Sequence, residues 1–157
     1  MVTKEKTPYL IFAIDDRKLA IELSLVEQVY SAVEVTPLEG APDTVLGLIN
    51  VHGTMVVVLN VRRKLGLRQR SIELSDQIVI VNIEERQLAL LVDEVVEVLH
   101  ASPDEITAPK PYNAKIAEEK HGFSTETDKI ELYELLHFLS SEDEEKLTTA
   151  LQLAYSH

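Results

Sequence analysis

Apolar runs interrupted by short charged tips mark the first part of this sequence, a pattern typical of β-strands joined by turns. The stretch from Ile11 to Tyr30 aligns without a gap with the stretch from Ile80 to Leu99, at an offset of 69 residues. Seven of the 20 aligned positions are identical: Ile11/Ile80, Ile14/Ile83, Arg17/Arg86, Leu19/Leu88, Ala20/Ala89, Val26/Val95 and Val29/Val98. The alignment predicts one β-hairpin used twice. Because the charged tips at 15–18 and 84–87 contain no Gly, we expect four-residue connections rather than two-residue turns.

Each hairpin is followed by a Val-x-x-Val element, a Thr/Pro-containing loop and a further strand. A unit of about 65 residues buries only about 60% of its unfolded surface, so two such units are expected to pack on each other. We therefore predict a mainly β fold of two five-stranded SH3-like or OB-like barrels that share a core, with short helices. The first barrel is expected at about 9–67 and the second at about 76–139, within one domain spanning 1–157.

The segment 140–157 has a different pattern and predicts an amphipathic helix. Ser141 and Glu144 have the spacing of a capping box, and acidic residues fill the first turn. Its apolar stripe consists of Leu147, Ala150, Leu151 and Ala154. This stripe packs either on the protein's own core, which we favour because apolar stripes usually do so, or on a partner.

Composition narrows the classes of partner. With 15 Lys and Arg against 27 Asp and Glu, the formal charge of −12 disfavours nucleic acid and anionic membranes as partners. Apolar runs such as Met55 to Leu59 are too short to span a bilayer, and the start MVTKEKTPY lacks a signal-peptide apolar segment. We therefore expect a cytoplasmic protein. The absence of Cys excludes disulfides and thiolate chemistry.

A search for catalytic or cofactor-binding patterns finds none. No metal-binding spacing such as HExxH links the five histidines His52, His100, His121, His137 and His157. Phosphate-binding Gly motifs and the GxSxG nucleophile motif are also absent. Asp15 and Asp16 lie at a predicted tip, where water keeps both carboxylates ionised. By elimination we expect a binding protein, without cofactor or metal, rather than an enzyme.

Two stretches resemble the signatures of the CheW-like adaptor family. GLINVHGTMVVVLNVRRKLGL (Gly47 to Leu67) resembles the central signature, a Gly-x-x-Asn-x-Arg-Gly turn followed by a strand, an Asp and an Arg. LVDEVVEV (Leu91 to Val98) resembles the second signature, and APDTVLG and IELYELLHFL resemble flanking patterns in the right order. The resemblance covers about residues 9 to 139. Gly47 and Gly53 are expected at positions of positive φ or close backbone approach, and Asn50 is expected to close the turn.

The resemblance implies two intertwined five-stranded barrels and a role in chemotaxis without catalysis. The expected partners are the cytoplasmic tip of a chemoreceptor (a methyl-accepting chemotaxis protein) and the regulatory domain of a CheA-type histidine kinase, which has the same fold. The partner-binding residues that the resemblance implies are Val26, Gln28, Val29, Leu48, Asn50, His52, Gly53, Val95 and Val98. Half of these valines are equally consistent with core positions.

Four positions depart from the family pattern. The family's turn Arg is His52 and its Glu in the first Val-x-Glu-Val element is Gln28, whereas the second repeat keeps Glu97. We hypothesise that a neutral Gln28–His52 hydrogen bond replaces the family's candidate ion pair. Val57 replaces a Pro and regains a backbone donor, and Asn60 replaces an Asp and is an equally good helix cap.

Two other functions stay open. A divergent module that binds another signalling protein, for example in pilus motility, is consistent with the lost charges. A small barrel that binds a ligand or oligonucleotide predicts a basic groove with exposed aromatics, which the acidic, Trp-free composition disfavours.

Overall fold

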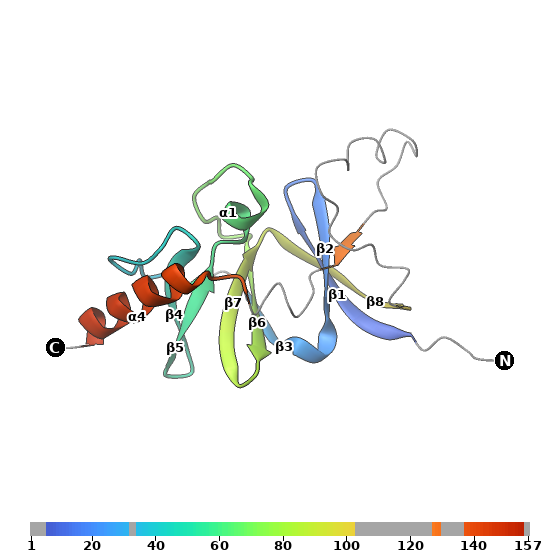
Figure 1. The fold of residues 1–157 in the computed structure, drawn as a ribbon. Helices are drawn as coiled ribbons and strands as arrows, with labels where there is room; N and C mark the ends of the chain where they lie inside the picture. Colours follow the sequence, from blue (N-terminus) through green and yellow to red (C-terminus); the bar gives the residue numbers. More distant parts are fainter. Residues whose placement is uncertain (1–5, 32–33, 103–126, 130–136, 156–157) are drawn as a thin grey trace.

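The computed structural model describes residues 6–31, 34–102, 127–129 and 137–155, which form two β-sheets and a C-terminal helix (Figure 1). Sheet A has the strand order β8 (Glu94–Ala101), β1 (Thr7–Ile14), β2 (Arg17–Glu22), β9 (Thr127–Lys129). Sheet B has the order β3 (Val26–Ser31), β6 (Gln77–Ile83), β7 (Arg86–Val92), β5 (Thr54–Leu59), β4 (Val45–Val51). The fold is thus mainly β with two subdomains, as predicted, although sheet A has four strands among the described residues rather than five.

The repeated hairpin is confirmed: β1 pairs with β2, and β6 pairs with β7, both antiparallel. The expected four-residue connections are wrong. Ile14 pairs directly with Arg17 and Ile83 with Arg86, so each turn has two residues. Glu84 and Glu85 adopt φ of 49° and 69°, the signs that a type I′ turn requires, without any Gly.

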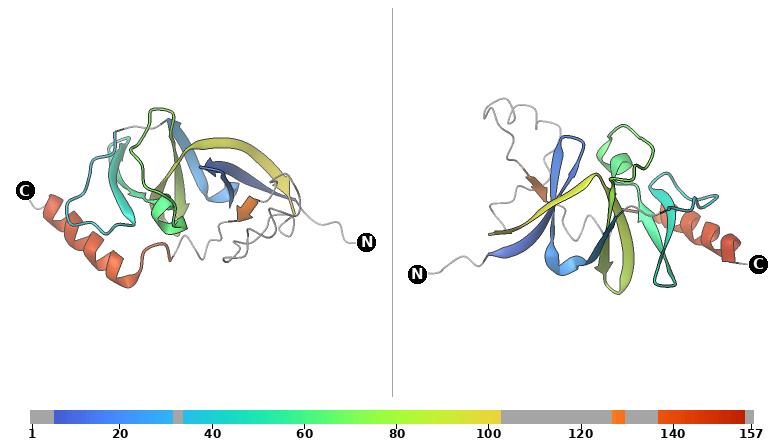
Figure 2. Two further views of the ribbon diagram at one scale, coloured as in Figure 1. Left: turned by 90° about the horizontal axis from the view of Figure 1, so that it is seen from above. Right: turned by 180° about the vertical axis from the view of Figure 1, so that it is seen from behind.

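The two sheets exchange strands between the halves of the sequence. β3 follows the first hairpin along the chain but pairs with β6 of the second hairpin, and β8 follows the second hairpin but pairs with β1 of the first. Figures 1 and 2 show β8 crossing from the end of β7 to the outer side of β1. The ranges 9–67 and 76–139 therefore describe the sequence repeat and do not separate the two sheets.

A shared apolar core lies between the sheets, and each sheet also has its own interior. Along β1, Leu10 and Phe12 face the shared core while Ile11 faces the interior of sheet A. Along β5, Val57 faces the shared core while Val58 faces the interior of sheet B. Because both faces of these strands are buried, the sequence shows continuous apolar runs rather than strict alternation.

Besides α4, the part of the chain that the structure describes contains two short helical segments. They are the 3₁₀ turn η1 (Leu23–Leu25) between β2 and β3, and α1 (Val61–Leu65) after β5. The predicted cap is confirmed, because Asn60 Oδ1 accepts a hydrogen bond from the backbone N–H of Arg63 at 3.2 Å. Gly66 ends α1 with a left-handed φ of 73°.

The C-terminal helix α4 (Ser141–Tyr155) is confirmed, but its predicted cap is wrong by one residue. Ser140 Oγ accepts a hydrogen bond from the N–H of Asp143 at 3.0 Å, so Ser140 and not Ser141 is the N-cap. None of the helices in the described residues is long and apolar enough to cross a membrane.

The middle of α4 packs on the protein itself. Leu147 belongs to the shared core, Ala150 is buried and Leu151 is partly buried, whereas Ala154 at the end of the predicted stripe is exposed. Arg86 at the turn between β6 and β7 pairs with Glu144 at 2.7 Å. Figures 1 and 2 show α4 beside sheet B and away from sheet A.

Candidate functional site

The residues expected to bind a partner lie in three places. On β3, Gln28 is exposed while Val26 and Val29 are half-buried against the shared core. In β4 and the turn after it, Leu48 is buried, whereas Asn50, His52 and Gly53 are exposed. On β8, Val95 is half-buried and the Val98 side chain is 45% exposed. The structure thus divides the set into exposed positions and positions that support them.

The turn between β4 and β5 has the geometry expected from its Asn and Gly residues. Asn50 Oδ1 accepts a hydrogen bond from the N–H of Gly53 at 2.8 Å, which closes the turn through the side chain. His52 and Gly53 have φ of 50° and 88°. At Gly47 the constraint is close approach, because a Cβ there would overlap the carbonyl oxygen of Thr36.

His52 contacts Tyr30 rather than Gln28. Tyr30 Oη and His52 Nε2 lie 3.2 Å apart and share a hydrogen bond, and the two rings meet edge to face. Within the described part of the chain, Gln28 forms no hydrogen bond with His52, so that hypothesis is wrong. The Tyr30–His52 contact joins β3 to the β4–β5 turn, the two ends of sheet B in its strand order. Sheet B is therefore strongly curled, which brings β3 and this turn onto one surface.

A second cluster, here called the ion-pair cluster, joins the two sheets beside α1. Arg62 contacts Asp15 at 2.7 Å and Asp93 at 2.9 Å. Asp15 lies in the turn between β1 and β2 of sheet A, and Asp93 lies where the chain crosses from β7 to β8. The backbone N–H of Asp15 also donates to Asp93 Oδ2 at 2.7 Å. Asp15 is therefore part of a contact between the sheets, not only a solvated tip.

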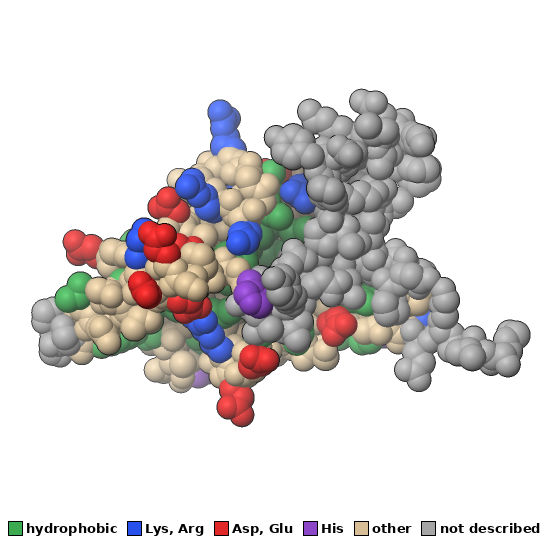
Figure 3. Space-filling view, in the orientation of Figure 1, with side chains coloured by type: hydrophobic (Ala, Val, Ile, Leu, Met, Phe, Trp, Pro, Cys, Tyr) green, Lys and Arg blue, Asp and Glu red, His purple; other side chains and the backbone are tan. Residues whose placement is uncertain are grey.

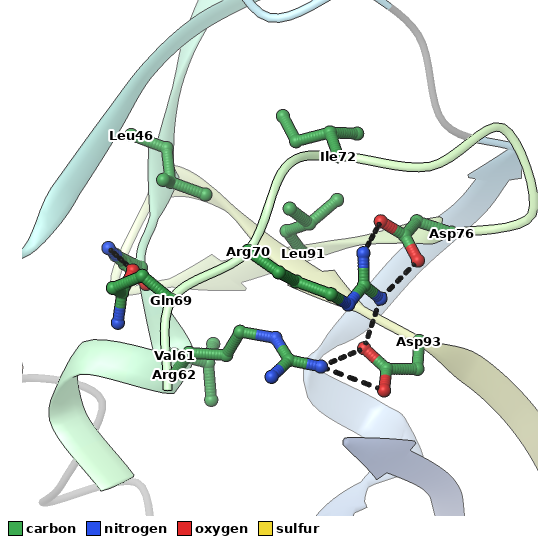
Figure 4. Close-up of a pocket in the computed structure, with 10 residues that line it drawn as sticks. Leu46, Val61, Arg62, Gln69, Arg70, Ile72, Asp76, Leu91 and Asp93 are labelled. Carbon is green, nitrogen blue, oxygen red and sulfur yellow. Dashed lines mark hydrogen bonds and ion pairs between the residues drawn. The ribbon is translucent and has the colours of Figure 1, made fainter. Parts of the chain in front are cut away.

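Arg70 extends the ion-pair cluster into the loop that follows α1 (Figure 4). Its guanidinium contacts Asp76 at 2.7 Å and Asp93 at 2.8 Å. The Asp76 side chain is only 2% exposed, and it also accepts the N–H of Glu73 at 2.8 Å. A buried carboxylate is stable only when it is paired and hydrogen-bonded in this way.

In the ion-pair cluster, neighbouring groups of opposite charge favour the ionised forms of Asp93, Arg62 and Arg70. Burial by itself raises the pKa of Asp93, but the N–H of Asp15 and the two guanidinium groups outweigh it and hold that pKa below its usual value. Hydrogen bonds to Asp15 and then to Asp93 raise the pKa of Arg62, and Asp76 chiefly raises the pKa of Arg70. A carboxylate held ionised as Asp93 is does not suit general acid–base catalysis near neutral pH.

The space beside the ion-pair cluster is small. Leu46, Ile72 and Leu91 line one side of a cavity of about 20 Å³, and the Arg and Asp side chains line the other (Figure 4). This volume suits about one water molecule and no larger ligand. Among the described residues, no three His, Asp or Glu side chains are grouped to hold a metal ion.

The ion-pair cluster and the Tyr30–His52 contact were not predicted from the sequence. A usable signal was present for the first: Arg62 and Asp93 each lie within one of the two stretches that resemble a family signature. No comparable signal marks Tyr30, because its distance from His52 depends on how sheet B curls.

Comparisons with known proteins agree with this architecture. The family model described as the CheW-like domain matches residues 8–137. The chain is 24% identical over 152 residues to the "Chemotaxis protein CheW" of Treponema pallidum (strain Nichols), covering 93% of this chain and 89% of that protein. It is 27% identical over 97 residues to the protein of the same name in Rhizobium meliloti (strain 1021), covering 62% and 63% of the two chains.

The fold is also similar to a solved structure, the scaffolding protein TtCheW from Thermoanaerobacter tengcongensis. The TM-score is 0.61 at 24% sequence identity, over 71% of this chain and 75% of that one. This likeness concerns the arrangement of the two β subdomains.

Proposed function

The chain belongs to the CheW-like domain family, and from this we propose that it is a cytoplasmic, non-catalytic adaptor that couples chemoreceptors to a CheA-type histidine kinase in bacterial chemotaxis. The observation that carries the proposal is the family match across residues 8–137, which spans both sheets. Relatives named as chemotaxis proteins and a relative named as a scaffolding protein support it.

We assign the partner contacts to the residues expected from the family, now sorted by exposure. Gln28, Asn50, His52, Gly53 and Val98 are exposed and would meet a partner directly. Leu48, Val26, Val29 and Val95 pack on the shared core and hold those positions in place. Since the strand exchange joins both halves of the sequence, we also propose that residues 1–157 act as one domain.

The curl of sheet B brings two groups of the proposed contact residues onto one surface. Gln28 on β3 and His52 in the β4–β5 turn come from strands at opposite ends of the sheet, yet the Tyr30–His52 contact brings the strands that carry them together. A partner that binds this surface covers both elements at once. Exposed polar groups around a partly apolar base are typical of transient protein–protein contacts.

Binding to each partner separately tests the proposal. The receptor's cytoplasmic tip and the kinase's regulatory domain, both from the same genome, are titrated with the wild-type chain and with His52→Asn. Asn tolerates the positive φ of this position but lacks the imidazole ring. We expect the wild-type chain to bind both proteins and His52→Asn to weaken at least one contact by about tenfold.

The control variant is Gln152→Ala, an exposed position on α4 away from this turn, which should bind as the wild-type chain does. Binding to the receptor tip without the kinase domain would contradict kinase coupling and favour a module for another signalling protein. Failure of a correctly folded chain to bind either protein would reject the proposal.

A further inference from the structure

Among the described strands, the chain crosses between the two sheets twice, and the two crossings differ in chemistry. From β2 to β3 it crosses through η1, where Leu23 and Leu25 pack on the shared core and Ser24 is exposed. From β7 to β8 it crosses at Asp93, the single residue between these strands. At the offset of 69 that relates the two repeats, Asp93 corresponds to Ser24. The ion-pair cluster therefore lies at one of two equivalent crossings, and the other crossing is held by apolar packing.

At its crossing, Asp93 is tied to both sheets. Its backbone N–H donates to the carbonyl of Ala13 in β1 at 3.0 Å, and its carboxylate accepts the N–H of Asp15. From the side of sheet B, the same carboxylate accepts from Arg62 at 2.9 Å and from Arg70 at 2.8 Å (Figure 4). Arg62 also donates to Asp15 from both terminal nitrogens, at 3.0 and 2.7 Å. One guanidinium group on α1 thus contacts both the β1–β2 turn of sheet A and the crossing.

These contacts restrain the angle between the sheets more narrowly than the shared core does. Apolar contacts are non-directional, so they favour burial without selecting one orientation. A guanidinium that reaches two carboxylates through fixed N–H positions is directional. The Arg62 side chain is only 11% exposed, so salt screens its contacts less than those of a surface pair. The orientation of sheet A on sheet B therefore depends on the ion-pair cluster.

The proposed contact residues lie on both sides of this junction. Val95 and Val98 belong to β8 of sheet A, which begins directly after Asp93. Gln28 and His52 belong to β3 and the β4–β5 turn of sheet B. These four residues lie outside the ion-pair cluster. A change in the angle between the sheets would therefore misalign the two groups without altering any side chain that meets a partner.

We propose that the ion-pair cluster positions the two sheets for binding, with Arg62 and Asp93 holding them at the angle that a protein partner in contact with both sheets requires. Arg62 and Asp93 are then positioning residues and not contact residues. Because the partner contact is part of the proposed function, this positioning role rests on it. Without the cluster each sheet stays folded but the range of angles widens, so the orientation that binds is populated less and the apparent affinity falls.

A neighbouring ion pair on α1 offers a matched control. Figure 3 shows Lys and Arg side chains on the surface around α1, with acidic side chains among them. Arg63 and Asp43 form an exposed pair at 3.2 Å, with side chains that are 56% and 79% exposed. Both belong to the side of sheet B, since α1 follows β5 and Asp43 precedes β4. Removing this pair should leave the contact between the sheets unchanged.

Pulsed electron paramagnetic resonance on the free chain tests whether the cluster sets the angle. The chain has no Cys, so Lys18→Cys on β2 and Thr54→Cys on β5, both exposed, provide one spin label on each sheet. We expect Arg62→Gln to broaden or shift the distance distribution and Arg63→Gln to leave it unchanged. Asp15→Asn is a milder change at a 43% exposed side chain, and Asn tolerates the φ of 54° there. It should broaden the distribution in the same direction.

Binding of the unlabelled variants to the receptor tip and to the kinase regulatory domain tests the consequence. We expect Arg62→Gln to weaken at least one contact by about fivefold, although Arg62 is not a contact residue, and Arg63→Gln to bind as the wild-type chain does. Circular dichroism at the temperature of the titration shows that each variant is folded.

Distance distributions that neither Arg62→Gln nor Asp15→Asn alters would overturn the positioning role. Equal affinities of the folded Arg62→Gln variant and the wild-type chain would overturn it as well. A wild-type chain that binds neither protein would reject the proposed function, and with it the link to a partner, whereas the distance distributions would still decide whether the cluster sets the angle between the sheets.

Discussion

Gly47 shows how one position limits the choice of residue where two segments meet. Thr36 and Leu48 form an isolated bridge beside it, with both N–O distances at 2.8 Å, and this brings the Thr36 carbonyl against the Gly47 Cα. Any side chain here must displace backbone, whereas a Cβ at Gly53 would have no atom within 4 Å. Gly47 in β4 and Gly53 in the turn after it are therefore needed for different reasons.

Gly47→Ala should lower the free energy of unfolding by about 2–4 kcal/mol, because the new methyl group overlaps the Thr36 carbonyl. Gly53→Ala should lower it by only about 1–2 kcal/mol, the cost of a left-handed backbone for an L-residue. Urea unfolding of both variants measures the difference. Equal losses at the two positions would contradict the close approach at Gly47.

Asp93→Asn should destabilise the protein by about 1–2 kcal/mol at pH 7, because Asp93 lies between two guanidinium groups and is partly exposed. The fold lowers the pKa of Asp93, so its stabilising effect is present above the ordinary carboxyl pKa of about 3.9 and is lost as pH falls through the lowered value. Unfolding measured from pH 7 down to acid should show the two proteins converge. A difference that stays constant with pH would argue against an ionic role.

Individual residues were predictable where the requirement is local. Asn50 and Asn60 act as the sequence suggested, because a turn closure and a helix cap depend on neighbours three residues away. Contacts that depend on tertiary structure were not predictable. The partner of His52 was expected to be Gln28, two residues from Tyr30 on the same strand, and only the curl of sheet B decides between them.

Among the elements, α4 begins at two neighbouring serines, Ser140 and Ser141, of which only Ser140 caps the helix. Ser140→Ala should lower the free energy of unfolding by about 1 kcal/mol, because it removes the acceptor for the N–H of Asp143. Ser141→Ala lies one residue inside the helix and should change it by less than about 0.5 kcal/mol. Thermal unfolding of the pair measures both. A larger effect at Ser141 would restore the capping box first expected from the sequence.

The packing of α4 gives a second prediction. Leu147→Ala should lower the free energy of unfolding by about 2–5 kcal/mol, because the side chain is buried in the shared core and its removal leaves a cavity. Leu153→Ala, the same chemical change at a mostly exposed site on the same helix, should change it by less than about 0.5 kcal/mol. Denaturant midpoints compare the two. Similar losses would show that α4 does not pack as described.

Element types followed from the sequence more reliably than turns and pairing. The hairpins and α4 have apolar periodicities that predict them. For the hairpins, the repeat at an offset of 69 residues was additional support. The turn lengths were wrong because Asp15, Glu84 and Glu85 accept positive φ without Gly. The exchange of β3 and β8 between sheets leaves no trace in periodicity, since each strand has the same pattern whichever neighbour it pairs with.

For the whole molecule, strand exchange and the shared core predict cooperative unfolding. Each sheet contains strands from both halves of the sequence, and the ion-pair cluster links sheet A to the loop after α1. Far-ultraviolet circular dichroism and tyrosine fluorescence should therefore give one coincident transition. Separate fragments 1–68 and 69–157 should not fold alone, because β3 and β8 would lose their partners. Two resolved transitions would contradict cooperative unfolding of the whole chain.

We propose that this chain bridges a chemoreceptor and a kinase, and a three-component gel-filtration experiment tests that bridging. The receptor's cytoplasmic tip and the kinase's regulatory domain are mixed with and without the chain, and each peak is analysed for its components. We predict that the two proteins elute together only when the chain is present, and that His52→Asn reduces the co-eluting fraction. Co-elution without the chain, or none with it, would contradict the adaptor function.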